Sequence, residues 1–412
     1  MPHTFDVGAA RAQFPALALK DDGRPRIYFD NPAGTQVPQI VVDRTVETLL
    51  RKNANLGGYF RTTEMATALV DEAHRAVADL YNAASPDEII FGQNMTTLTL
   101  HMSRCLAKRF STGDEIILSR MDHDANVAPW LLMAEDVGMV VRWMEFDSES
   151  YEFPADALIK VLSKRTKLLA MGMASNCTGT IHDVKDFAKQ AKAAGALVYL
   201  DAVQYAPHEA IDVQAIGADF VVSSAYKWFG PHMAALWGRT DVLNETFGYK
   251  VRAVGQELPH KFETGTLSHE GMAGCIGAIE YLQGFGSGAI RRAQIASAWS
   301  NIAEYERGLS LHLIKRLREV KDLTIRGVTS ANAMHRRVPT VSFTLEGHHP
   351  TALAKHFAAD NMFVWSGRNY ALEPIKAMGL EDKGGVLRVG PAHYNTSQEI
   401  DAFADSLHRA MK

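Results

Sequence analysis

Three polar residues, each of a type that can take part in catalysis, stand at the ends of short apolar runs. Asn176, Asp201 and Lys227 follow one another at intervals of 25 and 26 residues. Each interval has the length of one helix followed by one strand. Because ligands of open parallel sheets bind beyond the carboxyl ends of the strands, this spacing predicts an amide, a carboxylate and an amine in one crevice.

These three groups suit a site for pyridoxal 5'-phosphate (PLP). A lysine amine such as that of Lys227 can form a Schiff base with the aldehyde of PLP. A carboxylate such as Asp201 keeps the pyridine nitrogen protonated and makes the ring an electron sink, and an amide such as Asn176 can contact the ring oxygen. Each residue alone has a plainer interpretation, because a single Asp or Lys after a strand is usually a turn residue or a solvated one.

Two further segments lie between an expected strand and an expected helix. Thr96 and Thr97, in residues 93–97 (QNMTT), could bind phosphate through amides and hydroxyls at a helix N-terminus. A plain helix cap is the alternative. His123 could stack on the cofactor ring and move protons, or it could be an ordinary loop histidine.

A metal site is the weaker hypothesis. No His-x-x-x-His or comparable spacing accompanies the acidic and imidazole groups. The pair His348 and His349 precedes Pro350, which is typical of a solvated turn rather than of a ligand set.

The elements that must position these residues alternate between short apolar runs and amphipathic stretches. Asp183 and Gly195 supply the cap and the terminator of one expected helix. Alternation of this kind predicts a parallel sheet with helices on both faces. The expected strands are residues 88–91, 115–119, 139–145, 167–173, 196–201 and 219–223, and the expected helices are residues 96–110, 126–137 and 183–195.

The pattern changes after Gly274. A long segment carries an apolar stripe at helical spacing, made by Ile302, Tyr305, Leu309, Leu313 and Leu317. Shorter runs at 340–345, 362–364 and 386–389 predict strands, and a helix is expected from about Ser397. We therefore expect a large domain at residues 15–285 and a smaller C-terminal α+β domain that consists of residues 286–412 together with residues 1–14.

Composition excludes several classes of protein. The 412 residues are 47% hydrophobic, carry a formal net charge of −4 and include only three cysteines. These values are typical of a globular enzyme and give no overall attraction to nucleic acid or to an acidic membrane. We find no membrane span, secretory signal or disulfide framework, and we expect a cytoplasmic protein.

Taken together, these residues resemble the class V aminotransferase superfamily, and within it the cysteine desulfurases and selenocysteine lyases. The resemblance implies the α/β fold of PLP enzymes of fold type I, with a mainly parallel seven-stranded sheet in the large domain. The segments that carry it are residues 28–34 (YFDNPAG), 122–126 (DHDAN), 175–180 (SNCTGT), 201–204 (DAVQ), 224–227 (SAYK), 262–266 (FETGT), 387–389 (LRV) and 394–396 (YNT).

The resemblance also implies roles for single residues. It implies that His123 stacks on PLP, that Asn176 and Gln204 contact the ring oxygen, and that Asp201 pairs with the pyridine nitrogen. Ser224 and the residue before the lysine are expected to hold the phosphate. Relatives usually have His at that second place, where this chain has Tyr226.

Two further implied roles concern the substrate and a second subunit. The loop that contains Gly265 and Thr266 is similar to a family loop that reaches the phosphate of the neighbouring subunit, which implies a homodimer. Arg388 matches the arginine that binds the substrate carboxylate, a task suited to a guanidinium fork. Arg368, Tyr59 and Arg61 are further candidates near the substrate, and the last two are equally well read as loop residues.

One departure from the desulfurases affects the chemistry. Tyr370 stands where they carry a nucleophilic cysteine, and Trp365 stands where they often have arginine. A phenol cannot accept sulfur to form a persulfide. Cys177 lies in the wrong part of the sequence for a mobile sulfur carrier, and Cys105 and Cys275 are expected to be buried structural thiols.

We therefore expect a PLP-dependent lyase that acts on a small amino acid by C–S bond cleavage or β-elimination, without persulfide transfer. Lys227 is expected to remove the α-proton of the substrate, assisted by Asp201 and His123. The alternatives are an aminotransferase, an amino-acid epimerase and a PLP-binding protein without catalysis.

Overall fold

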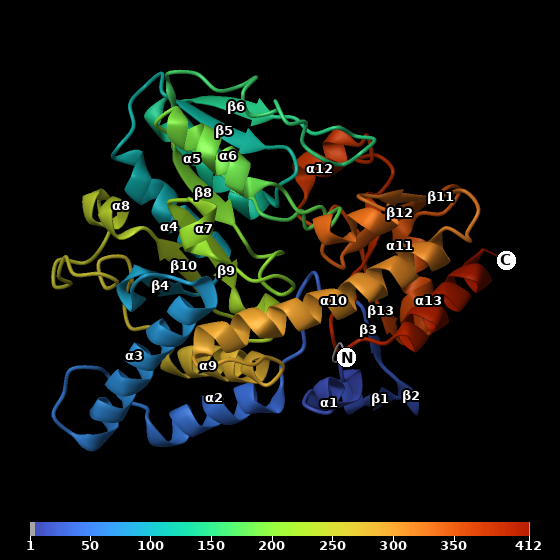
Figure 1. The fold of residues 1–412 in the computed structure, drawn as a ribbon, viewed down its shortest axis with the longest axis horizontal. Helices are drawn as coiled ribbons and strands as arrows, with labels where there is room; N and C mark the ends of the chain where they lie inside the picture. Colours follow the sequence, from blue (N-terminus) through green and yellow to red (C-terminus); the bar gives the residue numbers. More distant parts are fainter. Residues whose placement is uncertain (1–4, 412) are drawn as a thin grey trace.

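A seven-stranded sheet forms the centre of the large unit in the computed structural model, which describes residues 5–411 (Figure 1). The strands follow the order β4 (Ile89–Gly92), β10 (Ala234–Gly238), β9 (Phe220–Ser224), β8 (Leu197–Asp201), β7 (Thr166–Gly172), β5 (Glu115–Ser119) and β6 (Val140–Met144). Five neighbouring strands pair in parallel, from β9 through β6. The expected mainly parallel α/β sheet is confirmed.

Strand β10 is absent from the prediction made on the sequence. It runs antiparallel to both β4 and β9, between which it is inserted. The parallel strand-to-strand steps of the sheet all use crossover connections, but β10 returns from β9 through the short segment that contains Lys227. That segment thereby has strands on both sides, which limits its movement.

Helices cover both faces of this sheet. Successive strand residues point to opposite faces, so Ile117, Leu169 and Val198 join one buried apolar cluster while Ile116 and Leu168 join another. The first cluster includes residues of α3 (Arg61–Tyr81), α6 (Val184–Ala193) and α9 (His269–Gln283), and the second includes residues of α4 (Met95–Ala107) and α5 (Ala128–Val137). The expectation of helices on two faces is confirmed.

Caps explain where several of these helices begin and end. Asp183 accepts a hydrogen bond from the amide of Asp186 at the start of α6, and Gly195 has a φ of 82° just beyond its end. The helix expected at 126–137 is shorter, because a single 3-10 turn at Asp124–Asn126 precedes α5.

A second, antiparallel sheet forms the smaller unit. Its order is β11 (Leu323–Arg326), β12 (Val341–Leu345), β15 (Val386–Val389) and β14 (Trp365–Gly367). The helices of this part are α11 (Pro350–Ala359), α12 (Leu372–Ala377) and α13 (Ser397–Ala410). The strand expected at 362–364 is β13 (Met362–Phe363), which pairs in parallel with β3 (Ile27–Tyr28) outside this sheet.

The long helix α10 (Arg291–Leu317) connects the two units and carries the predicted apolar stripe. It packs against α3 and α9 of the large unit and against α13 of the small unit (Figure 1). The N-terminal segment also contacts the C-terminal part of the chain, since Arg11 donates to the carbonyl of Tyr394. The exact boundaries at residues 14 and 285 stay a prediction.

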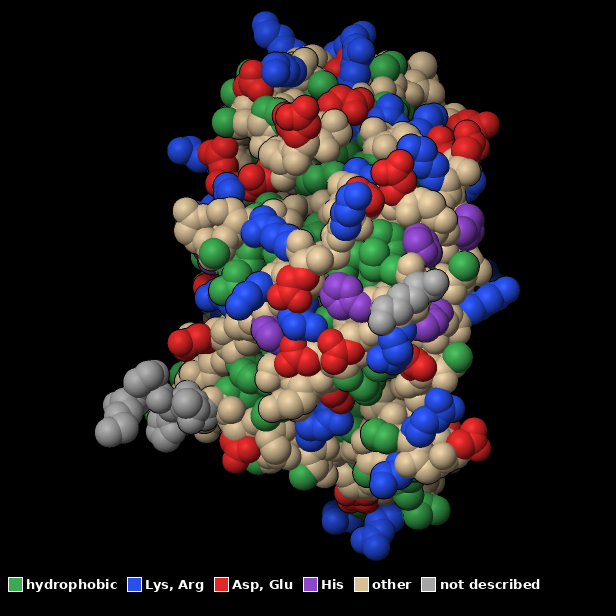
Figure 2. Space-filling view, turned by 90° about the vertical axis from the view of Figure 1, so that its right-hand side faces the viewer, with side chains coloured by type: hydrophobic (Ala, Val, Ile, Leu, Met, Phe, Trp, Pro, Cys, Tyr) green, Lys and Arg blue, Asp and Glu red, His purple; other side chains and the backbone are tan. Residues whose placement is uncertain are grey.

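The remaining elements are short or peripheral. They are α1 (Val7–Arg11), β1 (Lys20–Asp21), β2 (Arg24–Pro25), α2 (Gln39–Arg51), α7 (Val213–Ile216) and α8 (Thr240–Glu245). Figure 2 shows acidic and basic side chains interspersed over one face of the molecule, so this face carries no broad patch of one sign. Within residues 5–411, no helix combines the length and apolarity that a membrane span requires.

Candidate active site

Asn176, Asp201 and Lys227 lie together, as their spacing predicts. Asp201 ends β8, Lys227 lies in the 3-10 turn after β9, and Asn176 follows β7. All three line one cavity beyond the carboxyl ends of these strands, which we call the inner cavity. Its lining consists of Asn94, Met95, Thr96, Asp122, His123, Ala125, Gly172, Ala174, Asn176, Asp201, Val203, Gln204, Ser224, Tyr226 and Lys227.

Lys227 is buried, and its ammonium nitrogen Nζ donates a hydrogen bond to the carbonyl oxygen of Pro32. Burial, together with the positive charge of Arg388, lowers the pKa of Lys227 to about 7. A large fraction of this amine is therefore uncharged near neutral pH. An uncharged amine is the form that attacks an aldehyde or removes a proton.

Asp201 and Asp122 are both buried carboxylates that line the inner cavity. Burial raises the pKa of Asp201 to about 6, while its Oδ1 accepts a hydrogen bond from the amide of Val203 at 2.8 Å. Asp122 accepts from the hydroxyl of Ser119 at 2.7 Å and from the side-chain amide of Asn126 at 2.7 Å. Asp122 thus holds the turn that presents His123, a role that the sequence did not predict although Asp122 belongs to the same motif.

The imidazole of His123 faces an aromatic ring from the small unit. It stacks on Tyr370 with ring centroids 5.5 Å apart and an interplanar angle of 21°. Its Nδ1 accepts a hydrogen bond from the amide of Ala125 at 3.0 Å. Burial is the main cause that lowers the pKa of His123 to about 3, and the charges of Lys227 and Arg388 lower it further. The ring is therefore neutral, and because Nδ1 accepts a hydrogen bond, Nε2 carries the proton.

Arg388 reaches the same region from β15 of the small unit. Its Nη1 donates to the carbonyl of Asn176 at 3.2 Å, and its Nη2 lies 3.7 Å from Oδ1 of Asp30. Arg388 lines a second space of about 610 Å³, which we call the outer cavity. The outer cavity shares Thr96, His123, Ala125, Asn176, Tyr226 and Lys227 with the inner one.

Several buried polar atoms around the two cavities have no hydrogen-bond partner among residues 5–411. They are Oδ1 of Asp30, Oδ1 of Asn176, Oε1 of Gln204, Oδ1 of Asn369 and Nε of Arg388. The amide nitrogens of Asn176 and Gln204 donate to the carbonyl of Asn369 and to the hydroxyl of Thr340, at 2.7 and 2.8 Å. Because buried polar groups are normally paired, this cluster fits a polar ligand such as PLP together with a substrate carboxylate.

The expected phosphate end lies at the N-terminus of α4. Thr96 lines both cavities, and Ser224 accepts a hydrogen bond from the amide of Met95 at 3.0 Å. The structure does not bring Thr97 to either cavity. This side chain is exposed, and both its amide and its hydroxyl are bonded to Asn94, the N-cap of the helix.

Tyr226 lines both cavities next to Lys227, as its place in the sequence predicts. Its ring stacks on His232, with centroids 5.1 Å apart and an interplanar angle of 13°. An imidazole is therefore adjacent to this tyrosine even though the residue before the lysine is not histidine. His232 was not singled out on the sequence, since contact between these two rings depends on the turn at Ala225–Lys227.

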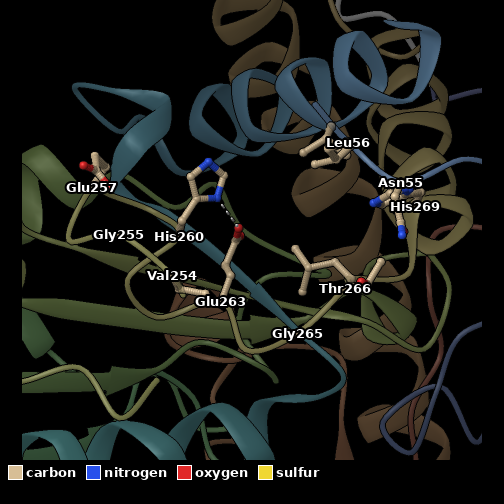
Figure 3. Close-up of a pocket in the computed structure, with 12 residues that line it drawn as sticks. Asn55, Leu56, Val254, Gly255, Glu257, His260, Glu263, Gly265, Thr266 and His269 are labelled. Atoms are coloured by element: carbon tan, nitrogen blue, oxygen red, sulfur yellow. Dashed lines mark ion pairs between the residues drawn. The ribbon is translucent and has the colours of Figure 1, made fainter. Parts of the chain in front are cut away.

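Gly265 and Thr266 lie in a separate cavity of about 430 Å³ (Figure 3). It is also lined by His260, His269 and Glu263. Nδ1 of His260 lies 3.6 Å from Oε2 of Glu263, and Figure 3 marks this ion pair with a dashed line. Within one chain, Gly265 and Thr266 therefore line neither the inner nor the outer cavity. Their expected role at the phosphate of a neighbouring subunit stays a prediction.

Comparison with known sequences supports the same family. The sequence matches the family described as aminotransferase class-V over residues 27–403. An aminotransferase-like protein of Gibberella zeae is 32% identical over 418 residues, and a cysteine desulfurase of Yersinia pestis is 30% identical over 423 residues. Each of these two matches covers 99% of both chains. A probable cysteine desulfurase of Mycolicibacterium paratuberculosis is 32% identical over 419 residues, which cover 98% of this chain but only 58% of that protein.

Solved structures share the fold over nearly the whole chain. The apo cysteine desulfurase from Thermococcus onnurineus NA1 superposes with a TM-score of 0.87 at 26% identity, covering 98% of this chain and 97% of that chain. The S-sulfonic acid form of the cysteine desulfurase CsdA from Escherichia coli has a TM-score of 0.85 at 27% identity, covering 99% and 98%. With the match over residues 27–403, these relatives show that the chain is a PLP-dependent enzyme and belongs to the class-V aminotransferase family.

Proposed function

We propose that this enzyme cleaves the bond between Cβ and sulfur in an amino acid by β-elimination, without passing the sulfur to a thiol of its own. The main observation in support is that none of its three cysteines lines the inner or the outer cavity, although all three lie in the described part of the chain. Tyr370 lines the outer cavity at the place where the resemblance expects the desulfurase cysteine.

Cys177 is the cysteine nearest to the site in sequence, and its environment supports the proposal. It is fully buried in an apolar cluster with Ala371, Ile375, Leu380 and Val386. Burial raises the pKa of its thiol to about 11, so the nucleophilic thiolate is scarce at neutral pH. Cys105 and Cys275 are buried in α4 and α9, and burial raises the pKa of each thiol as well.

The residues of the inner cavity are suited to hold PLP. Asp201 would meet the pyridine nitrogen, His123 would lie against the ring, and Lys227 would bind the aldehyde carbon. Thr96 and Ser224 would hold the phosphate at the N-terminus of α4. When bound, PLP supplies an electron sink for the electron pair that the substrate releases at Cα.

The chain's own groups then bind the substrate and move its proton. Arg388 binds the α-carboxylate through two parallel hydrogen bonds, which fixes the position of Cα in the outer cavity. Nζ of Lys227 takes the proton from Cα in its uncharged form. The bond from Cβ to sulfur breaks with its electron pair on sulfur, which leaves as a thiol after gaining a proton. One water is consumed, and a thioether of cysteine yields the thiol, pyruvate and ammonia.

The test is a single turnover of purified holoenzyme with a panel of amino acids that includes cysteine, cysteine thioethers and alanine. Elimination predicts equal amounts of thiol (or sulfide), keto acid and ammonia, with the cofactor spectrum returning to its starting form. Conversion of the cofactor to its amine form with one keto acid would replace the proposal by a transaminase. An unchanged cofactor spectrum with every amino acid would indicate a binding protein without catalysis.

A further inference from the structure

We propose that the substrate carries a large apolar group on its sulfur, aromatic or branched aliphatic, which is held at the mouth of the outer cavity. Leu100, Leu132, Trp365 and Tyr370 form this mouth, which we call the apolar rim. The inference rests on the proposed elimination, because it identifies the class of leaving group that the site accepts.

The polar residues that would act on the substrate and the large apolar residues of the outer cavity differ in their exposure to solvent. The residues that would bind the substrate or remove its proton are Lys227, Asn176 and Arg388, and all three are buried. The four residues of the apolar rim are instead exposed, at 37% for Leu100, 54% for Leu132, 55% for Trp365 and 73% for Tyr370. A substrate anchored at Arg388 would therefore extend its far end toward the rim.

The rim is assembled from three separate parts of the fold. Leu100 comes from α4, Leu132 from α5, and Trp365 and Tyr370 from β14 and the loop that follows it. Single exposed apolar side chains are normal on a protein surface, but a cluster around one cavity indicates a binding site. Ala128 and Pro129 add to the apolar lining of the outer cavity.

The loop that carries Tyr370 is held in place rather than free. Asn369 and Tyr370 both have a left-handed backbone, with φ values of 52° and 53°, a conformation that residues other than glycine adopt rarely. Two hydrogen bonds of 2.7 Å support it, from the side-chain amide of Asn176 to the carbonyl of Asn369 and from the backbone amide of Asp124 to the carbonyl of Tyr370. The phenol ring stacks on His123 and presents a flat aromatic surface to a ligand.

Size and charge support the same class of group. The outer cavity has a volume of about 610 Å³, within the range of roughly 300–1,000 Å³ that holds drug-sized ligands. Because Thr96, His123 and Lys227 line it together with the inner cavity, this volume is shared by the cofactor and the substrate. The charged residues that line the outer cavity are Lys227, Arg388 and Asp124, with His123 neutral. Lys227 and Arg388 are assigned to the reacting atoms, which leaves no free cation in this lining for an anionic substituent.

The first experiment compares kcat/KM for S-benzylcysteine, S-methylcysteine, S-carboxymethylcysteine and S-(2-aminoethyl)cysteine. We expect S-benzylcysteine to exceed the other three by at least about tenfold, because a single methylene in an apolar pocket already changes specificity by about 10-fold or more. Equal values, or a preference for a charged substituent, would overturn the inference while the elimination itself stands.

The second experiment measures binding without turnover. The probes are 3-(benzylthio)propionate and 3-(methylthio)propionate, which keep the carboxylate but lack the amine, and calorimetry gives their Kd for the holoenzyme. We expect the benzyl compound to bind about tenfold more tightly. Trp365→Ala and Leu132→Ala should remove most of that difference.

Leu131→Ala is the matched control for these variants. Leu131 precedes Leu132 on α5 and is 38% exposed, but it does not line the outer cavity. The benzyl preference should be unchanged in this variant, and its loss there would overturn the assignment to the apolar rim. If the benzyl preference in binding persists but no thioether releases a thiol, the elimination is refuted while the rim's preference for apolar groups is retained.

Discussion

The guanidinium of Arg388 and the carboxylate of Asp30 face each other inside the protein, with Nη2 and Oδ1 separated by 3.7 Å. Arg388 belongs to β15 of the small unit, whereas Asp30 lies two residues before Pro32, whose carbonyl accepts a hydrogen bond from Lys227. The proposed carboxylate anchor and the proposed base are therefore connected through one short segment.

Replacing Arg388 by lysine should weaken substrate binding. Lysine keeps the positive charge but cannot form two parallel hydrogen bonds to a carboxylate. A hydrogen bond to a charged group contributes about 1.5–3 kcal/mol, so we expect KM to rise by about 10- to 100-fold in steady-state kinetics. Arg326→Lys, on β11 of the same sheet, is the control and should leave KM near the wild-type value. An unchanged KM in Arg388→Lys would remove Arg388 from the substrate site.

Asp30 should make carboxylate binding dependent on pH. Burial raises the pKa of Asp30 to about 6, even though the nearby Arg388 and Lys227 lower it. Above pH 6 the anionic carboxylate of Asp30 competes with the carboxylate of the ligand for Arg388. Below pH 6 Asp30 is a neutral acid and no longer competes. Binding of 3-(methylthio)propionate should therefore strengthen as the pH falls from 7.5 to 5.5. This slope should disappear in Asp30→Asn, and the same slope in both proteins would contradict the competition.

Lys227 should react with PLP at a lower pH than an ordinary lysine. Its pKa is lowered to about 7, so the uncharged amine predominates above pH 7 and is lost below it. The rate at which the apoenzyme is reconstituted with PLP should rise with a midpoint near pH 7 and then level off. In Lys227→Ala, borohydride should trap no cofactor on the protein. Trapping at the wild-type level in that variant would disprove the assignment of the lysine.

Asp201→Ala should lower kcat by at least about 10²-fold while the protein stays folded, because the ring proton loses its counter-charge. The measurement is the single-turnover rate with the best substrate, together with the absorbance of the bound cofactor. Asp183→Asn is a suitable control, since Asp183 caps α6 and does not line the inner cavity. Turnover close to wild type in Asp201→Ala would show that this carboxylate does not pair with the ring nitrogen.

Glu263 should stabilise the fold within a limited pH range. Its Oε1 lies 2.9 Å from Nε2 of His74 and also accepts from the amide of Phe91. Although burial raises the pKa of Glu263, hydrogen bonds from His260 and His74 outweigh it and lower the net pKa. For His74, burial lowers the pKa, but Glu263 outweighs it and raises the net value.

The directions of these two pKa shifts define the pH range in which the pair of His74 and Glu263 stabilises the fold. The contribution of Glu263 is present above its unfolded pKa and is lost as the pH falls through its lowered folded pKa. The contribution of His74 is present below its unfolded pKa and is lost as the pH rises through its raised folded pKa. Glu263→Gln should reduce the free energy of unfolding by about 1.5–3 kcal/mol near pH 5.5 and by less at pH 9, as followed by urea denaturation. Equal losses at both pH values would contradict a charged pair.

The sequence by itself determined which residues reach the inner cavity from neighbouring parallel strands. Asn176, Asp201 and Lys227 follow runs that form β7, β8 and β9, and parallel strands end at one edge of a sheet. Spacing along the chain was therefore enough to predict that these three groups meet. The same local logic predicted the position of α6, because its cap and its terminating glycine lie next to it in the sequence.

Only the tertiary structure decided which groups reach the site from far along the chain and which turn away. The stacking of His123 on Tyr370 and the approach of Arg388 to Asp30 join segments that no local pattern links. Thr97 follows Thr96 directly, yet its side chain points out of the site. Successive side chains of a helix are rotated by roughly 100° about its axis, so neighbours in sequence face different directions. The pKa values depend on burial and on distant charges, so they follow from packing, which is a property of the whole fold rather than of any one segment.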